Sequence, residues 1–284
     1  TCRGTPARGR SRVRAGFDRA EGQTVATLTT GREREVRYRR TGSGPPVVLV
    51  AAGGPGDFWQ AHQVPALVAA GYEAITLELP EAAGPRDELT ALLAESVELL
   101  GTGPCGLVGF SLGAQLVQGL LVHRPDLWTR AVLVATRGRP DPVGGALLSA
   151  ERALHEAGVQ PPPRYQAFFQ AVLHLGPRTW EREGEILDWL DLFEAGVRAG
   201  GVPGEPPGDQ ADQLAGLRGV TGPVLVLGFQ HDLVAPPRLG REVAEALSAG
   251  CYREIPDCGH YGCLERPGTV NEAIVGFLGA PAPR

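Results

Sequence analysis

The sequence predicts an α/β protein with a mostly parallel central sheet, helices on both faces of that sheet, and an inserted helical cap. Short apolar runs bounded by turn residues alternate with segments of helical periodicity. The runs are continuously apolar, which is typical of parallel strands buried on both faces. The alternation stops once, over residues 137–221, where helical periodicity continues without a convincing strand.

The first half of the chain predicts a hairpin followed by strand–helix units. Apolar and polar side chains alternate in two segments around Gly31, which predicts a hairpin of residues 24–30 and 33–39. Apolar runs then predict strands at residues 47–50, 74–79, 106–110 and 131–135, and the segments between them predict helices at residues 57–70, 87–100 and 112–123. Right-handed crossovers between such strands build one sheet.

The second half holds the insertion and the end of the sheet. Its elements are predicted as strands at residues 224–227 and 252–255 and helices at 238–247 and 269–278. Aromatic and aliphatic residues predicted to pack the cap are Phe168, Phe169, Leu173, Trp180, Leu187, Trp189, Leu190 and Phe193. A Gly/Pro-rich stretch at 200–209 predicts the linker back to the sheet. We therefore divide the chain into a basic, flexible tail (1–20), a core (21–136 and 222–284) and a cap (137–221).

Composition excludes several classes of protein. Apolar residues make up 43% and charged residues 21% of the chain, which excludes an intrinsically disordered protein. No apolar run approaches the about 20 residues that span a bilayer, so no membrane partner is expected. Residues 1–40 hold 11 Arg and four acidic residues, but they lack interleaved aromatics and any nucleic-acid-reading motif. We interpret the basic head as a solvated terminus and expect no nucleic-acid partner.

The use of Arg and Cys indicates the source and compartment. All cationic side chains other than His are Arg, and Met is absent, which suggests a GC-rich bacterial gene. Five Cys spread along the chain do not resemble a disulfide framework. The first 30 residues hold no secretory signal pattern. We therefore expect a cytoplasmic protein.

A serine between a strand and a helix is the candidate nucleophile. The motif Gly109-Phe110-Ser111-Leu112-Gly113 joins the predicted strand 106–110 to the predicted helix 112–123. A sharp turn at this point exposes the serine hydroxyl, and the flanking glycines avoid collisions with the neighbouring strand and helix. Ligands of open parallel sheets bind at the carboxyl ends of strands. Ser111 is therefore placed where a substrate would bind.

With this motif the chain resembles the α/β-hydrolase fold superfamily with a serine nucleophile, over residues 23–279. The resemblance extends to Gly228-Phe229-Gln230-His231-Asp232 after one late strand and to Pro256-Asp257-Cys258-Gly259-His260 after the next. In that superfamily the chain order is Ser, Asp, His. The resemblance implies that Asp232 is the catalytic acid and His260 the general base. Serine needs such help because its hydroxyl is a weak nucleophile near neutral pH.

The resemblance also implies an oxyanion hole. The backbone N–H of Leu112, which follows the nucleophile, would donate one hydrogen bond to the tetrahedral oxyanion. The family pattern His-Gly-x-Pro-Gly appears here as Ala52-Gly53-Gly54-Pro55-Gly56, which indicates Gly54 as the second donor, with Ala52 in place of the family's His. After the predicted strand 74–79 the chain also departs from a Gly-rich pattern found in many relatives. We therefore expect an atypical entrance to the substrate pocket.

Other residues are candidates for the same roles. His231 is adjacent to Asp232 but would break the chain order as the base, and Asp257 could replace Asp232 as the acid although it suits a turn. The remaining histidines lie within or beside helical patterns and are assigned surface or packing roles: His62, His123, His155 and His174. The spacing of Cys251, Cys258 and Cys263 around His260 matches zinc sites poorly, so we expect no metal and no cofactor.

The resemblance implies acyl transfer through a Ser111 acyl-enzyme. The expected substrate is a small ester or thioester, including one presented on a carrier, with water as the acceptor. Three alternatives stay open: an acyltransferase that passes the group to another acceptor in natural-product biosynthesis, a C–C bond hydrolase, and a non-catalytic ligand-binding relative. An Asp-nucleophile dehalogenase or epoxide hydrolase is disfavoured because the turn holds Ser111.

Overall fold

The computed structural model describes residues 12–14, 23–31, 33–51, 58–79, 85–200 and 212–280. The strands are β1 (Arg12–Arg14), β2 (Gln23–Thr29), β3 (Glu35–Thr41), β4 (Pro46–Ala51), β5 (Glu73–Glu78), β6 (Cys105–Phe110), β7 (Trp128–Val134), β8 (Val224–Phe229) and β9 (Gly250–Ile255). The helices are α1 (Gln63–Ala69), α2 (Arg86–Leu99), α3 (Leu112–His123), α4 (Pro142–Glu156), α5 (Pro163–His174), α6 (Pro177–Trp180), α7 (Glu183–Arg198), α8 (Leu214–Leu217), α9 (Pro237–Ala246), α10 (Gly262–Glu265) and α11 (Pro267–Leu278). A 3₁₀ turn, η1, spans Pro125–Leu127.

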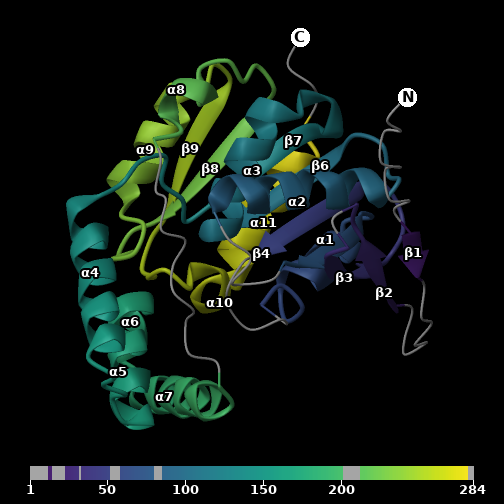
Figure 1. Ribbon diagram of the computed structural model, residues 1–284. Helices are drawn as coiled ribbons and strands as arrows, with labels where there is room; N and C mark the ends of the chain where they lie inside the picture. The colour runs from purple at the N-terminus through teal and green to yellow at the C-terminus, as the bar shows by residue number, and fades with distance from the viewer. Residues whose placement is uncertain are drawn as a thin grey trace, which may run out of the picture.

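These strands form one sheet with helices on both faces (Figure 1). The strand order is β1-β2-β3-β5-β4-β6-β7-β8-β9. Strands β1, β2 and β3 pair antiparallel, and β3 pairs antiparallel with β5. From β5 to β9 every pairing is parallel. The predicted fold class, a mostly parallel sheet flanked by helices, is therefore confirmed.

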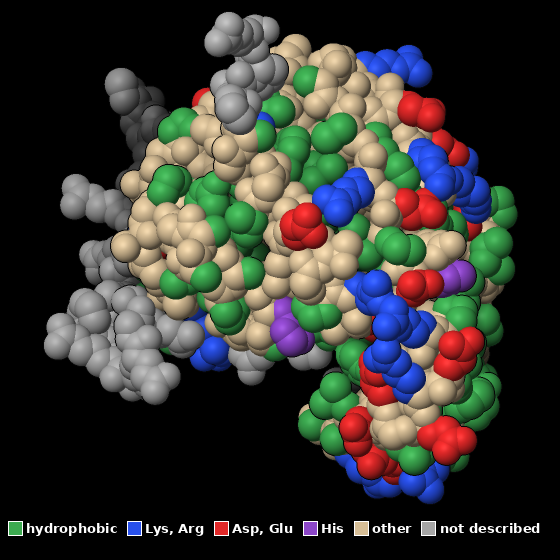
Figure 2. Space-filling view, turned by 180° about the vertical axis from the view of Figure 1, so that it is seen from behind, with side chains coloured by type: hydrophobic (Ala, Val, Ile, Leu, Met, Phe, Trp, Pro, Cys, Tyr) green, Lys and Arg blue, Asp and Glu red, His purple; other side chains and the backbone are tan. Residues whose placement is uncertain are grey.

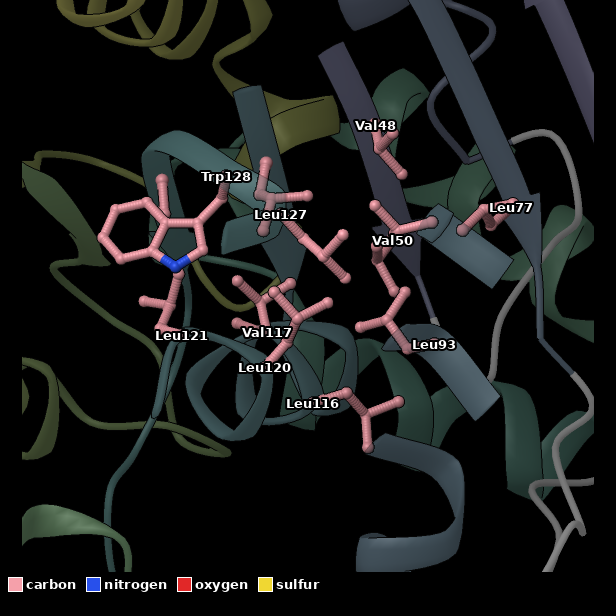
Figure 3. Close-up of a cluster of buried hydrophobic side chains, with 14 of the residues drawn as sticks. Val48, Val50, Leu77, Leu93, Leu116, Val117, Leu120, Leu121, Leu127 and Trp128 are labelled. Carbon is pink, nitrogen blue, oxygen red and sulfur yellow. The ribbon is translucent and has the colours of Figure 1, made fainter. Parts of the chain in front are cut away.

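Each face of the sheet has its own apolar core. On one face, Val48 and Val50 of β4 meet Leu93 of α2 and Leu116 and Leu120 of α3 (Figure 3). On the other face, α1 and α11 cover the sheet with side chains including Val64, Leu67, Val270 and Ile274. All six residues of β6 are buried, as are all six of β8. This double burial explains why the central strands are continuously apolar in sequence.

Several elements differ from the predictions. Helix α1 begins at Gln63 rather than at residue 57, because Phe58 and Trp59 form a buried turn before it. Strand β7 begins at Trp128, three residues before the predicted start at 131. Within the segment assigned to a flexible tail, Arg12–Arg14 forms the edge strand β1, which its many arginines did not indicate.

The cap consists of α4 to α7. It stands at one end of the molecule beside the sheet and forms a protrusion in the space-filling view (Figures 1 and 2). Helices α5 and α7 pack through a small cluster that includes Ala167, Ala171, Ile186 and Phe193. Helix α8 packs on the core, where Leu217 is buried. The division of the chain into core and cap stays a prediction. The predicted linker lies outside the described residues from 201 onward.

The helices in the described ranges are all too short or too polar to cross a lipid bilayer.

Candidate active site

Ser111 occupies a strained turn between β6 and α3. Its backbone has φ 53° and ψ −119°, a region that non-glycine residues rarely adopt. The turn brings α3 close to the sheet: a Cβ on Gly109 would lie 2.6 Å from Cα of Ala114, and a Cβ on Gly113 would overlap the carbonyl of Val50 in β4. Glycine at both positions therefore permits the turn, as the motif predicts.

The imidazole of His260 lies between the serine and a carboxylate. His260 Nε2 is 3.0 Å from Ser111 Oγ, and His260 Nδ1 is 2.8 Å from Asp232 Oδ2. Because an ionised carboxylate can only accept hydrogen bonds, Nδ1 carries the ring proton and donates a hydrogen bond to Asp232. The lone pair of Nε2 then accepts a hydrogen bond from the Ser111 hydroxyl. In this arrangement Nε2 can take the hydroxyl proton as the serine attacks a carbonyl.

Asp232 is held by its own loop. Its Oδ1 accepts hydrogen bonds of 2.8 Å from the backbone N–H groups of Val234 and Ala235, as in an Asx turn. The loop is in turn bound to the one that carries His260, because His231 N donates to Cys258 O at 3.0 Å. Asp232 and His260 are only 2% and 3% exposed, so their pairing is shielded from water.

Apolar and aromatic side chains surround the imidazole. The ring of Phe110, which precedes the serine, lies 5.0 Å from that of His260, and Phe58 stacks on Phe110 at 4.4 Å. From the cap, the His174 ring lies 5.7 Å from that of His260 and stacks on Tyr261 at 4.6 Å. Burial, assisted by the nearby His260, lowers the pKa of His174 to about 4. His174 is therefore neutral near neutral pH, and its Nδ1 donates to Gln170 O at 2.8 Å.

The structure thus brings three predicted residues together and leaves two undecided. Ser111, Asp232 and His260 follow β6, β8 and β9, whose carboxyl ends share one edge of the sheet. Leu112 is the first residue of α3, directly after the nucleophile. Gly54 lies outside the described residues, so its predicted role as an oxyanion donor stays a prediction.

The rival candidates do not join this network. Asp257 is exposed, with φ 55°, and its carboxylate lies 3.7 Å from the Arg178 guanidinium rather than near His260. Within the described ranges there is no group of three or more His, Cys, Asp or Glu side chains that could hold a metal ion. Cys258 and Cys263 are buried, and burial raises the pKa of both thiols, so they are poor nucleophiles.

The sequence predicts a surface or packing role for His174, and the structure places its ring beside the imidazole of His260. It ends α5, whose amphipathic pattern resembles that of any surface helix. Its partner Tyr261 is 87 positions away in the sequence, so no local pattern indicates the contact, in which Tyr261 N donates to His174 O at 3.0 Å. The only local signal is that His174 is followed within two residues by Gly176, which allows close approach of another backbone.

Comparison with known proteins identifies the family of the chain. The model of the alpha/beta hydrolase family matches residues 47–273. The chain belongs to the alpha/beta hydrolase family. It is 40% identical over 256 residues to "Putative non-heme bromoperoxidase BpoC" of Mycobacterium tuberculosis, an alignment that covers 85% of this chain and 96% of the relative.

A solved structure of this relative and a second relative extend the likeness. The crystal structure of BpoC from Mycobacterium tuberculosis H37Rv has a TM-score of 0.78 to this chain at 39% identity, covering 86% of this chain and 95% of that one. The chain is also 27% identical over 256 residues to "Putative carbamate hydrolase RutD" of Klebsiella pneumoniae, covering 84% of this chain and 94% of the relative. The predicted superfamily is therefore confirmed, and the chain is a member of a family of hydrolases.

Proposed function

We propose that this alpha/beta hydrolase cleaves an ester or thioester of a small organic acyl substrate through a Ser111 acyl-enzyme. The observation that carries the proposal is the continuous chain of hydrogen bonds from Ser111 Oγ through the His260 ring to Asp232, with distances of 3.0 and 2.8 Å. Such a chain supplies a nucleophile, a base and a group that orients the base. The strained backbone of Ser111 further supports the proposal, because strain of this kind is typical of functional sites.

The reaction proceeds in two steps. In the first, Ser111 Oγ attacks the carbonyl carbon, His260 Nε2 takes the hydroxyl proton, and the same nitrogen returns it to the leaving alcohol or thiol as the carbon–leaving-group bond breaks. In the second, His260 takes a proton from water, the resulting hydroxide equivalent attacks the acyl carbon, and the proton goes back to Ser111 Oγ. Asp232 stabilises the imidazolium in both steps without taking its proton.

The oxyanion is stabilised in this proposal by the N–H of Leu112 and that of Gly54. Leu112 begins α3, and the first N–H groups of a helix have no partner within the helix. The positive end of the helix macrodipole favours a negative oxygen at the same place. Removal of one oxyanion donor typically costs about 3 kcal/mol of transition-state stabilisation.

The name of one relative supports carbonyl chemistry, and the names of both suggest further assays. A carbamate hydrolase, as RutD is named, also cleaves a bond to a carbonyl carbon, so carbamates belong in the substrate panel. The BpoC name refers to bromoperoxidase activity. A serine acyl-enzyme leads to halide oxidation if hydrogen peroxide attacks the acyl carbon in place of water and releases a peracid. The peracid then oxidises bromide to hypobromite and is itself reduced to the carboxylic acid. Bromide oxidation that requires both peroxide and an acyl donor would identify peroxide as a competing acceptor.

The proposal is tested by covalent labelling. A fluorophosphonate is expected to form one adduct, on Ser111, in the folded protein, and Ser111→Ala is expected to abolish labelling without changing the circular dichroism spectrum. A panel of p-nitrophenyl esters, thioesters and carbamates then ranks the substrates by kcat/KM. Folded wild-type protein that forms no adduct at Ser111 and releases no product from any of these classes would refute the proposal.

A further inference from the structure

The cap touches the loop of His260 backbone against backbone. The segment Leu175-Gly176, between α5 and α6, lies on Cys258-Gly259, directly before the imidazole. A Cβ on Gly176 would lie 2.7 Å from Cα of Cys258, and a Cβ on Gly259 would lie 2.6 Å from the carbonyl oxygen of His174. No side chain fits at either position, so the two chain segments are in direct contact.

A single carboxylate joins these two segments. Glu265, at the end of α10, is half-buried, and this burial raises its pKa. Its Oε1 accepts hydrogen bonds from the Gly176 N–H at 2.9 Å and from the Thr179 hydroxyl at 2.5 Å, both in the cap. Its Oε2 accepts a hydrogen bond from the Gly259 N–H at 2.7 Å. One oxygen therefore binds the cap and the other binds the loop of the imidazole.

The backbone on both sides of His260 is thereby connected to the cap. The N–H before it, that of Gly259, reaches the cap through Glu265. The N–H after it, that of Tyr261, donates directly to His174 O in the cap at 3.0 Å. The side chain itself must keep two hydrogen bonds, to Ser111 and Asp232. A shift of the cap relative to this loop would therefore also move the imidazole.

We propose that Glu265 is a positioning residue that couples the placement of the cap to the placement of the His260 imidazole. The inference rests on the proposed serine hydrolase function, for which His260 is the general base. It differs from a role in stability alone, because it requires the rate of the chemical step to fall in protein that is fully folded. It also requires the cap and the His260 loop to loosen together when the carboxylate is lost.

Glu265→Gln is the informative substitution. An amide has one acceptor oxygen, whereas Gly176 and Gly259 present N–H donors to opposite oxygens of the side chain. Whichever way the amide turns, its NH₂ group faces one of these donors and that hydrogen bond is lost. Asp257→Asn is the matched control, because Asp257 lies on the same loop and reaches the cap through Arg178, but it is exposed and paired at 3.7 Å.

The test compares wild type, Glu265→Gln and Asp257→Asn at a temperature where circular dichroism shows all three folded. Glu265→Gln is expected to lower kcat for a p-nitrophenyl ester and the fluorophosphonate labelling rate about 10- to 100-fold, as a displacement of about 1 Å would. Amide hydrogen exchange is expected to speed up at both Gly176 and Gly259. Asp257→Asn is expected to leave the labelling rate and kcat within about twofold of wild type.

The outcomes separate the coupling from the proposed function. Wild-type protein that does not label at Ser111 refutes the hydrolase proposal. Wild-type protein that labels, with Glu265→Gln labelling equally fast, refutes the coupling and leaves hydrolysis standing. If Glu265→Gln does not fold, Thr179→Val replaces it, since it removes only the cap hydroxyl. Thr179→Val should slow fluorophosphonate labelling and speed amide exchange at Gly259, and Thr179→Ser should restore both to the wild-type rates. An unchanged labelling rate in Thr179→Val refutes the coupling.

Discussion

Replacement of Asp232 by Asn is predicted to remove the base by reversing the tautomer of His260. Two backbone N–H groups, of Val234 and Ala235, donate to Oδ1 at 2.8 Å, so an asparagine must place its amide oxygen there. Its NH₂ group then faces His260 Nδ1, which lies 2.8 Å from Oδ2 in the wild type. Nδ1 becomes an acceptor, and the ring proton moves to Nε2, which faces Ser111 Oγ. The serine hydroxyl is left without an acceptor for its proton.

The size of this effect follows from the loss of the correct tautomer. The same substitution in a serine protease lowers kcat about 10,000-fold, which corresponds to about 5 kcal/mol. We expect a similar loss for Asp232→Asn in kcat for p-nitrophenyl esters and in the fluorophosphonate labelling rate, with KM little changed. Denaturant unfolding should show the fold retained, since the two backbone hydrogen bonds persist. A folded Asp232→Asn protein that keeps more than about one tenth of wild-type kcat would refute the assignment of Asp232.

Three further predictions concern stability. Ser111→Gly should be more stable than Ser111→Ala by about 1 kcal/mol in urea unfolding, because only glycine relieves the strain at φ 53°; equal stability contradicts this. Gly113→Ala should lower the free energy of unfolding by about 1–3 kcal/mol, because the added Cβ would overlap the carbonyl of Val50. The loss would be seen as a lower Tm, and an unchanged Tm contradicts it. The pKa of His174 is lowered to about 4 from an ordinary value of 6.5, so the unfolded state binds more protons between these values and stability falls as pH decreases through them. As the pH falls from 7 to 5, the lowered pKa of His174 should reduce the free energy of unfolding by about 2 kcal/mol. His174→Gln should abolish that part of the pH dependence.

Local patterns predicted the sheet and the positions of three site residues. The strand-to-helix motif around Ser111 is read within five residues, because its backbone geometry demands glycine on both sides. The resemblance to the α/β-hydrolase superfamily implied Asp232 and His260, from the family's order of residues behind Ser111, and the structure places His260 within hydrogen-bond distance of both Ser111 and Asp232. Their catalytic roles stay predictions until labelling tests them. The predicted start of α1 at residue 57 was wrong, because the burial of Phe58 and Trp59 in the tertiary structure outweighs the helical periodicity of the sequence there.

The contacts between the cap and the core could not be predicted, because no local pattern specifies them. Glu265 resembles a solvent-facing acid in a helical segment, and its role depends on Gly176 and Thr179, which lie 89 and 86 positions away. Three donors that converge on one carboxylate can be recognised only in the folded protein.

The contact between the cap and the loop of His260 limits which cap residues can be substituted. A cap that touched the core only through side chains could change its pocket without affecting the general base. Here the cap backbone lies against Gly259, and Tyr261 N donates to His174 O. Because Gly259 and Tyr261 flank His260, a change in the position of the cap would also move the imidazole. Substitutions on the outer face of α5, such as at Tyr165 or Val172, leave these contacts untouched because both side chains are exposed. Substitutions in the cap are therefore constrained near Gly176 by the need to hold the His260 imidazole in place. Substitutions on the outer face of α5 are free of that constraint.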